Sequence, residues 1–219
     1  MVTIGWLCLS ACRSSAAISP LNSPTDISGP ATTLNFDGHP HGTFANTLYL
    51  TQGVVFSRDD GQAVVLYDAV AIGRLTPSPP NTLSTAWIPG VNSTYATHLN
   101  ARFASPLFAI GAYFGNERGD SDFTSISLSV FGLSGDLLGS VIVAGNGNRH
   151  TDQFIGLTSD IPFSRVRFDN LTASGSQSSA FAVSLDNLVF APVPEPSTVC
   201  LLGLGVLGFC LANRRRVIR

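Results

Sequence analysis

The sequence lacks the residues that usually cover the exposed faces of helices. All twelve of its basic residues are arginine, and Glu117 and Glu195 are its only glutamates. Lysine and glutamate are strong helix formers at solvent-facing positions, so long surface helices are not expected. The chain also has 21 Gly and 13 Pro among its 219 residues, which suits a fold with many turns. These features predict an all-β protein.

The net charge argues against a nucleic-acid-binding protein, and the positions of the cysteines argue against a disulfide-rich or cysteine-zinc domain. The formal net charge is -2, and residues 31–192 carry seven Arg against eleven Asp and one Glu, a net charge of -5. Nucleic-acid binding depends on clustered basic residues, so no nucleic-acid partner is expected. The four cysteines lie near the two ends, at positions 8, 12, 200 and 210. A disulfide framework or a cysteine-based zinc site is therefore excluded from the middle of the chain.

The N-terminal residues are typical of a secretory signal. Residues 1–17 are apolar first and small later, with Ser15 and Ala17 at the positions that signal peptidase requires, which predicts cleavage after Ala17. No basic residue precedes the apolar part, so either the start lies upstream or the signal is weak. Leu9–Cys12 also matches a lipoprotein cleavage box, in which Cys12 would be lipidated. Residues 18–30 are rich in Ser, Pro and Asn without periodicity, which predicts a disordered linker.

The C-terminal segment, residues 193–219, has three parts in a fixed order. The motif Pro194, Glu195 and Pro196 comes first, an uncharged stretch over 198–212 follows, and Arg214, Arg215 and Arg216 close it. This arrangement resembles the PEP-CTERM sorting region of Gram-negative bacterial surface proteins. The resemblance implies that an exosortase recognises the Pro-Glu-Pro motif and removes the helix after it. It also implies an exported protein of the cell envelope, cell surface or extracellular matrix.

The physics of residues 198–212 agrees with a transient membrane helix. Fifteen helical residues span about 22 Å at 1.5 Å each, short of a hydrocarbon core of roughly 30 Å. Extending the helix would bury arginines, which is costly. The arginine tail would stay in the cytoplasm by the positive-inside rule and leave the preceding residues outside. The alternative is a simple C-terminal membrane anchor with a proline-rich linker.

Strand-like runs separated by turn signals recur through residues 31–192. About ten short strands without a helical run predict one antiparallel β-sandwich of two sheets, a jelly roll, followed by the single transmembrane helix. The runs are 32–36, 54–56, 63–67, 95–103, 107–114, 125–131, 137–143, 153–157, 164–168 and 180–190.

Three local patterns refine this prediction. Ile126, Leu128 and Val130 alternate with serines, which predicts a strand with one buried and one solvated face. The glycines in 132–136 predict a hairpin connection. Near the end of the domain, the apolar residues change from odd to even positions at Asp186-Asn187, which predicts a β-bulge there.

The body also resembles the jelly-roll ectodomains of PEP-CTERM proteins and related carbohydrate-binding modules. The resemblance rests on an opening strand that ends at Asn35–Gly38, a middle segment over 131–140 and a closing segment over 181–188. Such modules often hold a structural Ca²⁺ between their first and last strands. Carried over, Asp37 and Asp186 would be calcium ligands, with Asn187 as a third. The acidic residue that is frequent on the family's first strand is Asn35 here, or is displaced to Asp37. In the alternative interpretation, both aspartates only accept hydrogen bonds in turns.

The sequence leaves three functions open. The first is a non-enzymatic structural or adhesive role in an exopolysaccharide or biofilm layer, which the resemblance implies. The second is a carbohydrate-binding module, for which Trp87 is the candidate stacking platform, although a tryptophan there more commonly plugs one end of a sandwich. The third is a divergent polysaccharide hydrolase. The sequence contains no recognisable catalytic motif that would identify active-site residues, so enzymatic activity is not expected.

Overall fold

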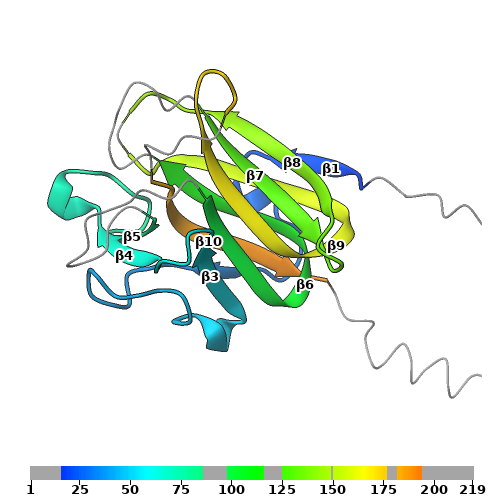
Figure 1. Ribbon diagram of the computed structural model, residues 1–219, viewed down its shortest axis with the longest axis horizontal. Helices are drawn as coiled ribbons and strands as arrows, with labels where there is room; N and C mark the ends of the chain where they lie inside the picture. The colour runs from blue at the N-terminus through cyan, green and yellow to red at the C-terminus, as the bar shows by residue number, and fades with distance from the viewer. Residues whose placement is uncertain (1–15, 86–97, 116–124, 149, 177–181, 194–219) are drawn as a thin grey trace, which may run out of the picture.

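The computed structural model describes residues 16–85, 98–115, 125–148, 150–176 and 182–193. These residues form β-strands and short 3₁₀ helices without any α-helix, and every strand pairing is antiparallel (Figure 1). The all-β prediction is therefore confirmed. None of the helices in this part of the chain is long and apolar enough to cross a membrane. Residues 198–212 lie outside the described ranges.

The strands and 3₁₀ helices occur in the following order along the chain, where η denotes a 3₁₀ helix. They are β1 (Ile18–Leu21), η1 (Pro24–Asp26), β2 (Thr32–Leu34), η2 (Leu50–Gln52), β3 (Val54–Arg58), β4 (Val65–Asp68), η3 (Val70–Ile72), β5 (Asn81–Ser84), β6 (His98–Gly115), β7 (Ser125–Gly132), β8 (Leu137–Ala144), β9 (Gln153–Leu171) and β10 (Ser184–Pro192).

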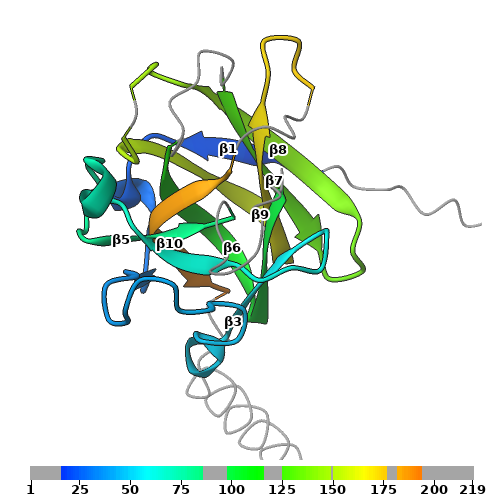
Figure 2. The same ribbon diagram turned by 60° about the vertical axis from the view of Figure 1, so that its left-hand side comes forward.

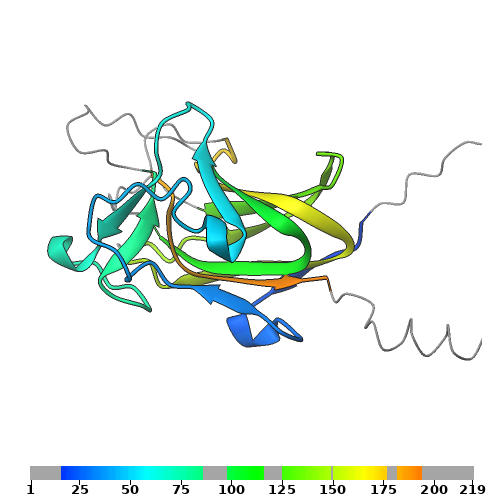
Figure 3. The same cartoon turned by 90° about the horizontal axis from the view of Figure 1, so that it is seen from below.

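All ten strands belong to one sheet, so the prediction of two separate sheets is corrected. The order is β4-β5-β10-β6-β9-β7-β8, with β1 on β9, β2 on β10 and β3 on β6. The long strands β6 and β9 connect the two halves of the sheet, because each pairs with different neighbours at its two ends. Their mutual register shifts on either side of Leu107. Figure 3 shows both strands curving there, so that the sheet folds back over itself.

The core lies between the two halves of the folded sheet. One cluster of buried apolar side chains takes members from every strand except β1 and β8, which pack partly buried side chains against it. Its largest fully buried members are Phe36, Phe56, Phe114, Phe163 and Phe168. Burial of these aromatic rings supplies much of the driving force for folding. The two layers are therefore held together by a shared core as well as by continuous strands.

The alternation in β7 is confirmed on one face and corrected on the other. Ile126, Leu128 and Val130 are fully buried, as predicted. Ser127 and Ser129 were expected in solvent, but their exposed fractions are only 8% and 5%. Ser129 Oγ lies 2.8 Å from Ser140 Oγ on β8, so a cross-strand hydrogen bond covers this position. The hairpin over 132–136 is confirmed, and Gly135 has a φ of 89°.

The segment 18–30 is ordered, contrary to the predicted linker. Ile18–Leu21 forms β1 and pairs with Gly156–Ser159 of β9. Ser23 then caps η1, while the Asp26 side chain accepts hydrogen bonds from the backbone of Asn22 and Ser23 in a capping box. Ile27 is 7% exposed and packs in a second, small apolar cluster with Ala109 and Val189. A strand of four residues is too short to show periodicity, which explains why composition alone predicted disorder.

Candidate functional site

Asp186 and Asn187 lie at a gap in the sheet beside β10. β5 pairs with Ser184 and Leu185 at the start of β10, whereas β2 pairs with Leu188–Phe190 further along. Because β6 occupies the other edge of β10, β2 and β5 must meet end to end along the same edge. Figure 2 shows β5 beside β10 in this region. Neither β2 nor β5 pairs with Asp186 or Asn187, so hydrogen-bonding groups outside these two strands must serve the polar groups on this edge of β10.

The predicted bulge is present at this gap. The pairing between β10 and β6 shifts register between Asp186 and Val189, and Asn187 has a φ of 46°. Asparagine tolerates this left-handed conformation better than most residues. The bulge interrupts the hydrogen-bond ladder between the segment of β10 that pairs with β5 and the segment that pairs with β2. The loop over 74–80 supplies hydrogen-bond donors for the Asp186 side chain at this interruption.

Three donors surround the Asp186 carboxylate, which has no exposed surface. The Thr76 hydroxyl and the Ser78 N–H, at 2.8 Å, both donate to Asp186 Oδ2. The Asn187 N–H donates to Asp186 Oδ1 at 2.6 Å. Asn187 therefore contributes to the site through its backbone N–H.

Asp37 reaches the same loop from the end of β2. The Ser78 hydroxyl donates to Asp37 Oδ2, and the Asn81 N–H donates to Asp37 Oδ1 at 2.9 Å. Ser78 therefore contacts both aspartates, one through its hydroxyl and the other through its backbone. The Asn81 side chain continues the network by donating to the carbonyls of Phe36 and His39. The structure thus brings together two aspartates that are far apart in the sequence.

The surroundings of Asp186 disfavour its charge. Burial raises the pKa of the Asp186 carboxyl to about 6, and the negative charge of Asp37 adds to the rise, while the hydrogen bonds from Thr76, Ser78 and Asn187 oppose it. Burial, together with the charge of Asp37, also raises the pKa of Tyr49 to about 12. Negative potential is therefore concentrated at this gap in the sheet.

This pKa predicts how stability changes with pH when no metal is bound. The pKa of Asp186 is higher in the folded protein than its ordinary value of 3.8, so folding is favoured by protonation. That contribution is fully present below about pH 4 and is lost as the pH rises through 6. Lowering the pH from 7.5 to 5.0 in EDTA should raise the free energy of unfolding by about 1.4 kcal/mol from this group.

Denaturant unfolding at the two pH values measures this effect. Asp186→Asn should remove the increase, whereas Asp136→Asn, at an exposed hairpin aspartate, should keep it. An equal pH dependence in Asp186→Asn and in the unmodified protein would contradict the assignment.

The residues at this gap fit a calcium ion. Calcium takes six to eight oxygen ligands from carboxylates, carbonyls and waters. The gap offers two carboxylates, two hydroxyls and the Asn81 Oδ1 atom, which is buried without a hydrogen-bond partner in the described part of the chain. Within the described residues, no group of three or more His, Cys, Asp or Glu could hold a metal, so neutral oxygens would have to complete the set. A site of oxygen donors alone does not suit zinc, which prefers nitrogen and sulfur.

Sequence reasoning missed Thr76, Ser78 and Asn81 as members of this site. Their segment falls between the predicted strand-like runs 63–67 and 95–103, and their partners are 41 to 110 positions away in the sequence. The other predicted site residues lie outside the described residues. They are the stacking candidate Trp87, the sorting residues Pro194, Glu195 and Pro196, and the tail residues Arg214, Arg215 and Arg216.

A second cluster of charged residues is satisfied internally. Asp169, only 2% exposed, bonds His98 Nδ1 through Oδ1 and accepts from Arg167 Nε at 2.8 Å through Oδ2. The Asn100 amide donates to Asp59 Oδ1 at 2.6 Å, and His98 Nε2 lies 3.7 Å from Asp59 Oδ2. The cluster links β6 and β9 across the sheet, which explains it as a structural network.

Solved structures share only a distant likeness with this chain. The K2 cleaved adhesin domain of Lys-gingipain has a TM-score of 0.47 and 17% identity, over 74% of this chain and 99% of that one. A DUF4465 family protein from Bacteroides caccae has a TM-score of 0.43 and 10% identity, over 81% and 100%. CsCBM6-3 from Clostridium stercorarium, in complex with cellobiose, has a TM-score of 0.28 and 13% identity, over 74% and 94%. Likeness at this level assigns no function.

The sequence comparisons identify the C-terminal segment. No curated protein matches the chain. The family model of the PEP-CTERM protein-sorting motif matches residues 192–216, which include the Pro-Glu-Pro motif, the apolar stretch and the arginines. The chain is therefore a PEP-CTERM sorting domain-containing protein, exported and directed to the cell envelope by a signal for exosortase processing.

Proposed function

We propose that this protein is a non-enzymatic structural or adhesive component of an exopolysaccharide or biofilm layer. One observation carries the proposal: the sorting motif begins where the folded domain ends. Pro192 is both the last residue of β10 and the first residue of the matched motif. Processing at Pro194, Glu195 and Pro196 would therefore deliver the whole sheet to the cell surface or matrix without cutting into it.

The topology of the precursor follows from the same segment. Residues 198–212 insert as a short membrane helix, and Arg214, Arg215 and Arg216 keep the tail in the cytoplasm. The folded domain then lies on the outer side of the inner membrane until an exosortase releases or re-anchors it. A helix near 22 Å is a marginal permanent anchor, which suits removal.

Replacing Pro194, Glu195 and Pro196 together with alanine should abolish processing. The precursor should accumulate in the inner-membrane fraction, and the shorter processed form should disappear from the surface and medium, because the exosortase loses its recognition motif. Immunoblots of cell fractions from a host with an exosortase measure both forms.

A matched control replaces Ser197, Thr198 and Val199 with alanine, the same number of substitutions directly after the motif. This control should be processed normally, and deletion of the exosortase should reproduce the motif defect. Normal processing of the motif variant, or unchanged processing without the exosortase, would overturn the sorting part of the proposal.

We also propose that Asp37 and Asp186 hold a structural Ca²⁺. The ion would cross-link the end of β2, the start of β5 and the bulge of β10 at the gap between the two ladders, where the Asp37 and Asp186 side chains accept hydrogen bonds from the loop and from β5. Its charge would offset the repulsion between the two carboxylates. The expected effect of the ion on the stability of the folded protein is large.

A further inference from the structure

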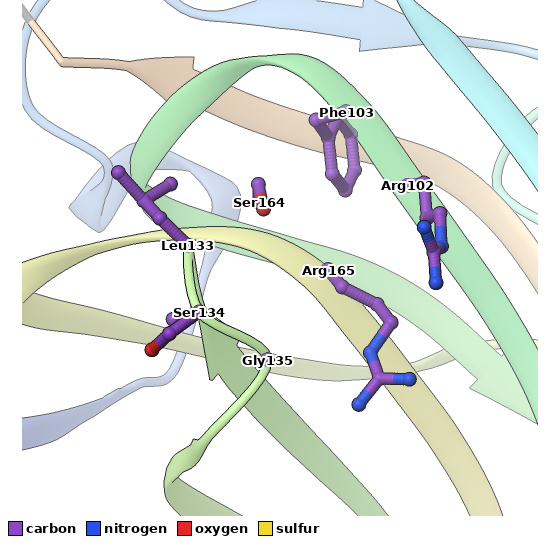
Figure 4. A pocket seen from close by; sticks show the side chains of 8 residues that line it. Arg102, Phe103, Leu133, Ser134, Gly135, Ser164 and Arg165 are labelled. Carbon is purple, nitrogen blue, oxygen red and sulfur yellow. The ribbon is translucent and has the colours of Figure 1, made fainter.

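A pocket of about 420 Å³ lies beside the bend of the sheet, away from the aspartate gap. Glycine-rich residues 132–135 of the β7–β8 hairpin form one wall, and residues on β6 and β9 form the other. Figure 4 shows Leu133 and Ser134 on one side and the side chains of Arg102 and Arg165 on the opposite side. The volume lies within the range typical of small-molecule sites.

Two arginines give this pocket its chemistry. Arg102 on β6 and Arg165 on β9 are direct cross-strand partners, so their side chains emerge next to each other on one face of the sheet. In the described part of the chain, neither arginine forms an ion pair with a carboxylate, unlike Arg58 and Arg167, which pair with Asp60 and Asp169. Two adjacent guanidinium groups without counter-charges favour an anionic ligand.

An aromatic ring holds one of the two guanidinium groups in place. The guanidinium carbon of Arg165 lies 3.9 Å from the centroid of the Phe131 ring, on the neighbouring strand β7. This cation–π contact restrains the long side chain, so that less entropy is lost when it binds. Because the Phe131 ring contacts only the flat face of the guanidinium, the N–H groups at its edges remain available. Two of these N–H groups can donate to both oxygens of one carboxylate.

The remaining lining suits a sugar ring better than a bare ion. Leu133 is 65% exposed at the mouth of the pocket and offers an apolar surface. Ser164 places a hydroxyl between the hairpin and the arginines. Asp136, the carboxylate of the same hairpin, accepts a hydrogen bond from the Ser134 hydroxyl at 2.8 Å. A ligand with one anionic group, several hydroxyls and an apolar ring face would use each of these features.

We propose that this pocket binds the carboxylate-bearing sugar of an acidic polysaccharide, with Arg102 and Arg165 gripping the carboxylate. This inference rests on the proposed residence in a polysaccharide layer and names the ligand class that the layer would present. The domain around the pocket is acidic, with a net charge of -5 over 31–192, so the arginine pair supplies attraction that is local to the site. A neutral glycan would make no use of it.

Titration calorimetry of the full chain in neutral detergent micelles tests the proposal. The probes are tri-galacturonic acid, the neutral galactotriose of the same length, and inorganic sulfate. The acidic trimer should bind, galactotriose should not bind detectably, and sulfate should bind at least tenfold more weakly than the acidic trimer. Arg102→Gln and Arg165→Gln should each weaken the binding of the acidic trimer about tenfold or more, since each removes a charge-assisted contact.

Two further variants separate charge from geometry. Arg165→Lys keeps the charge but loses the planar fork, so its affinity should fall between those of the unmodified protein and Arg165→Gln. Arg167→Gln removes the same charge two residues along β9, outside the pocket, and should change the affinity less than about threefold. Melting curves of each variant show whether it is folded.

Four outcomes would overturn the proposal. These are an absence of binding of the acidic trimer, equal binding of galactotriose, equal binding of sulfate, and unchanged affinity in both glutamine variants. The purified-protein assay is independent of sorting. Normal exosortase processing without uronate binding would overturn only the pocket, whereas uronate binding without processing would overturn only the sorting route.

Discussion

Gly115→Ala should be among the most destabilising single substitutions in this protein. A Cβ atom at Gly115 would lie 2.2 Å from the backbone oxygen of His150 and 2.7 Å from the Cα of Thr151. Both neighbours are backbone atoms, so no side-chain rotation can relieve the overlap. Overpacking of this kind costs about 3 kcal/mol or more, which corresponds to a melting temperature lower by roughly 6 to 12 °C.

The contacts of Thr151 explain why the backbone cannot easily move. Its N–H donates to the Leu75 carbonyl at 2.9 Å, and its hydroxyl lies 3.1 Å from Ser184 Oγ at the start of β10. Shifting Thr151 away from Gly115 would loosen the loop that leads to Thr76 and Ser78. The close approach at Gly115 therefore supports the aspartate gap indirectly.

Gly38→Ala is the matched control for this substitution. A Cβ at Gly38 meets nothing within 4 Å, and its backbone is not left-handed. Its free energy of unfolding should stay within about 0.5 kcal/mol of the unmodified protein. Denaturant unfolding of both variants decides the matter, and equal stabilities would show that the His150 backbone gives way without cost.

The predicted runs overlap eight of the ten strands, all but β1 and β5, but they could not predict how the strands join. Residues 98–103 of the first run and the run 107–114 belong to one strand, β6, and the runs 153–157 and 164–168 belong to one strand, β9. Pro106 and Pro162 lie in the intervals that separated these runs. Proline breaks a local pattern without ending a strand when it sits at an irregular position, and the pairing of β6 with β9 is irregular there. A single bent sheet therefore looked like two sheets.

Only part of the candidate site could be predicted from the sequence. The parity change at Asp186-Asn187 correctly predicted the bulge, because side chains on a strand alternate strictly. Asp37 and Asp186 were paired by resemblance alone. The loop residues Thr76 and Ser78 carry no periodic signal, and only the folded sheet shows that they fill the gap between β2 and β5. The arginine pocket was equally hidden, since Arg102 and Arg165 become neighbours through strand register.

Calcium should stabilise the full chain strongly at pH 7.5. With the ion at about a hundred times its dissociation constant, a site present only in the folded state adds about 2.7 kcal/mol, or roughly 5 to 10 °C in melting temperature. The gain should shrink at pH 5.0, because protonation of Asp186, with its pKa of about 6, competes with the ion. Melting curves in calcium and in EDTA at both pH values measure the gain.

The specificity of this gain distinguishes a built site from a general salt effect. Magnesium should stabilise less, because it demands a smaller octahedral site and releases its waters reluctantly. Asp186→Asn and Asp37→Asn should each lose most of the calcium gain, since a site with only two carboxylates cannot spare one. Asp136→Asn should retain it, because that side chain is exposed and bonds Ser134 in the hairpin. If Asp186→Asn does not fold, Asp37→Asn and a calcium-electrode titration of the unmodified protein still decide the question. Equal melting temperatures in calcium and EDTA, together with no calcium uptake, would leave the two aspartates as hydrogen-bond acceptors that hold the loop over 74–80 against β10.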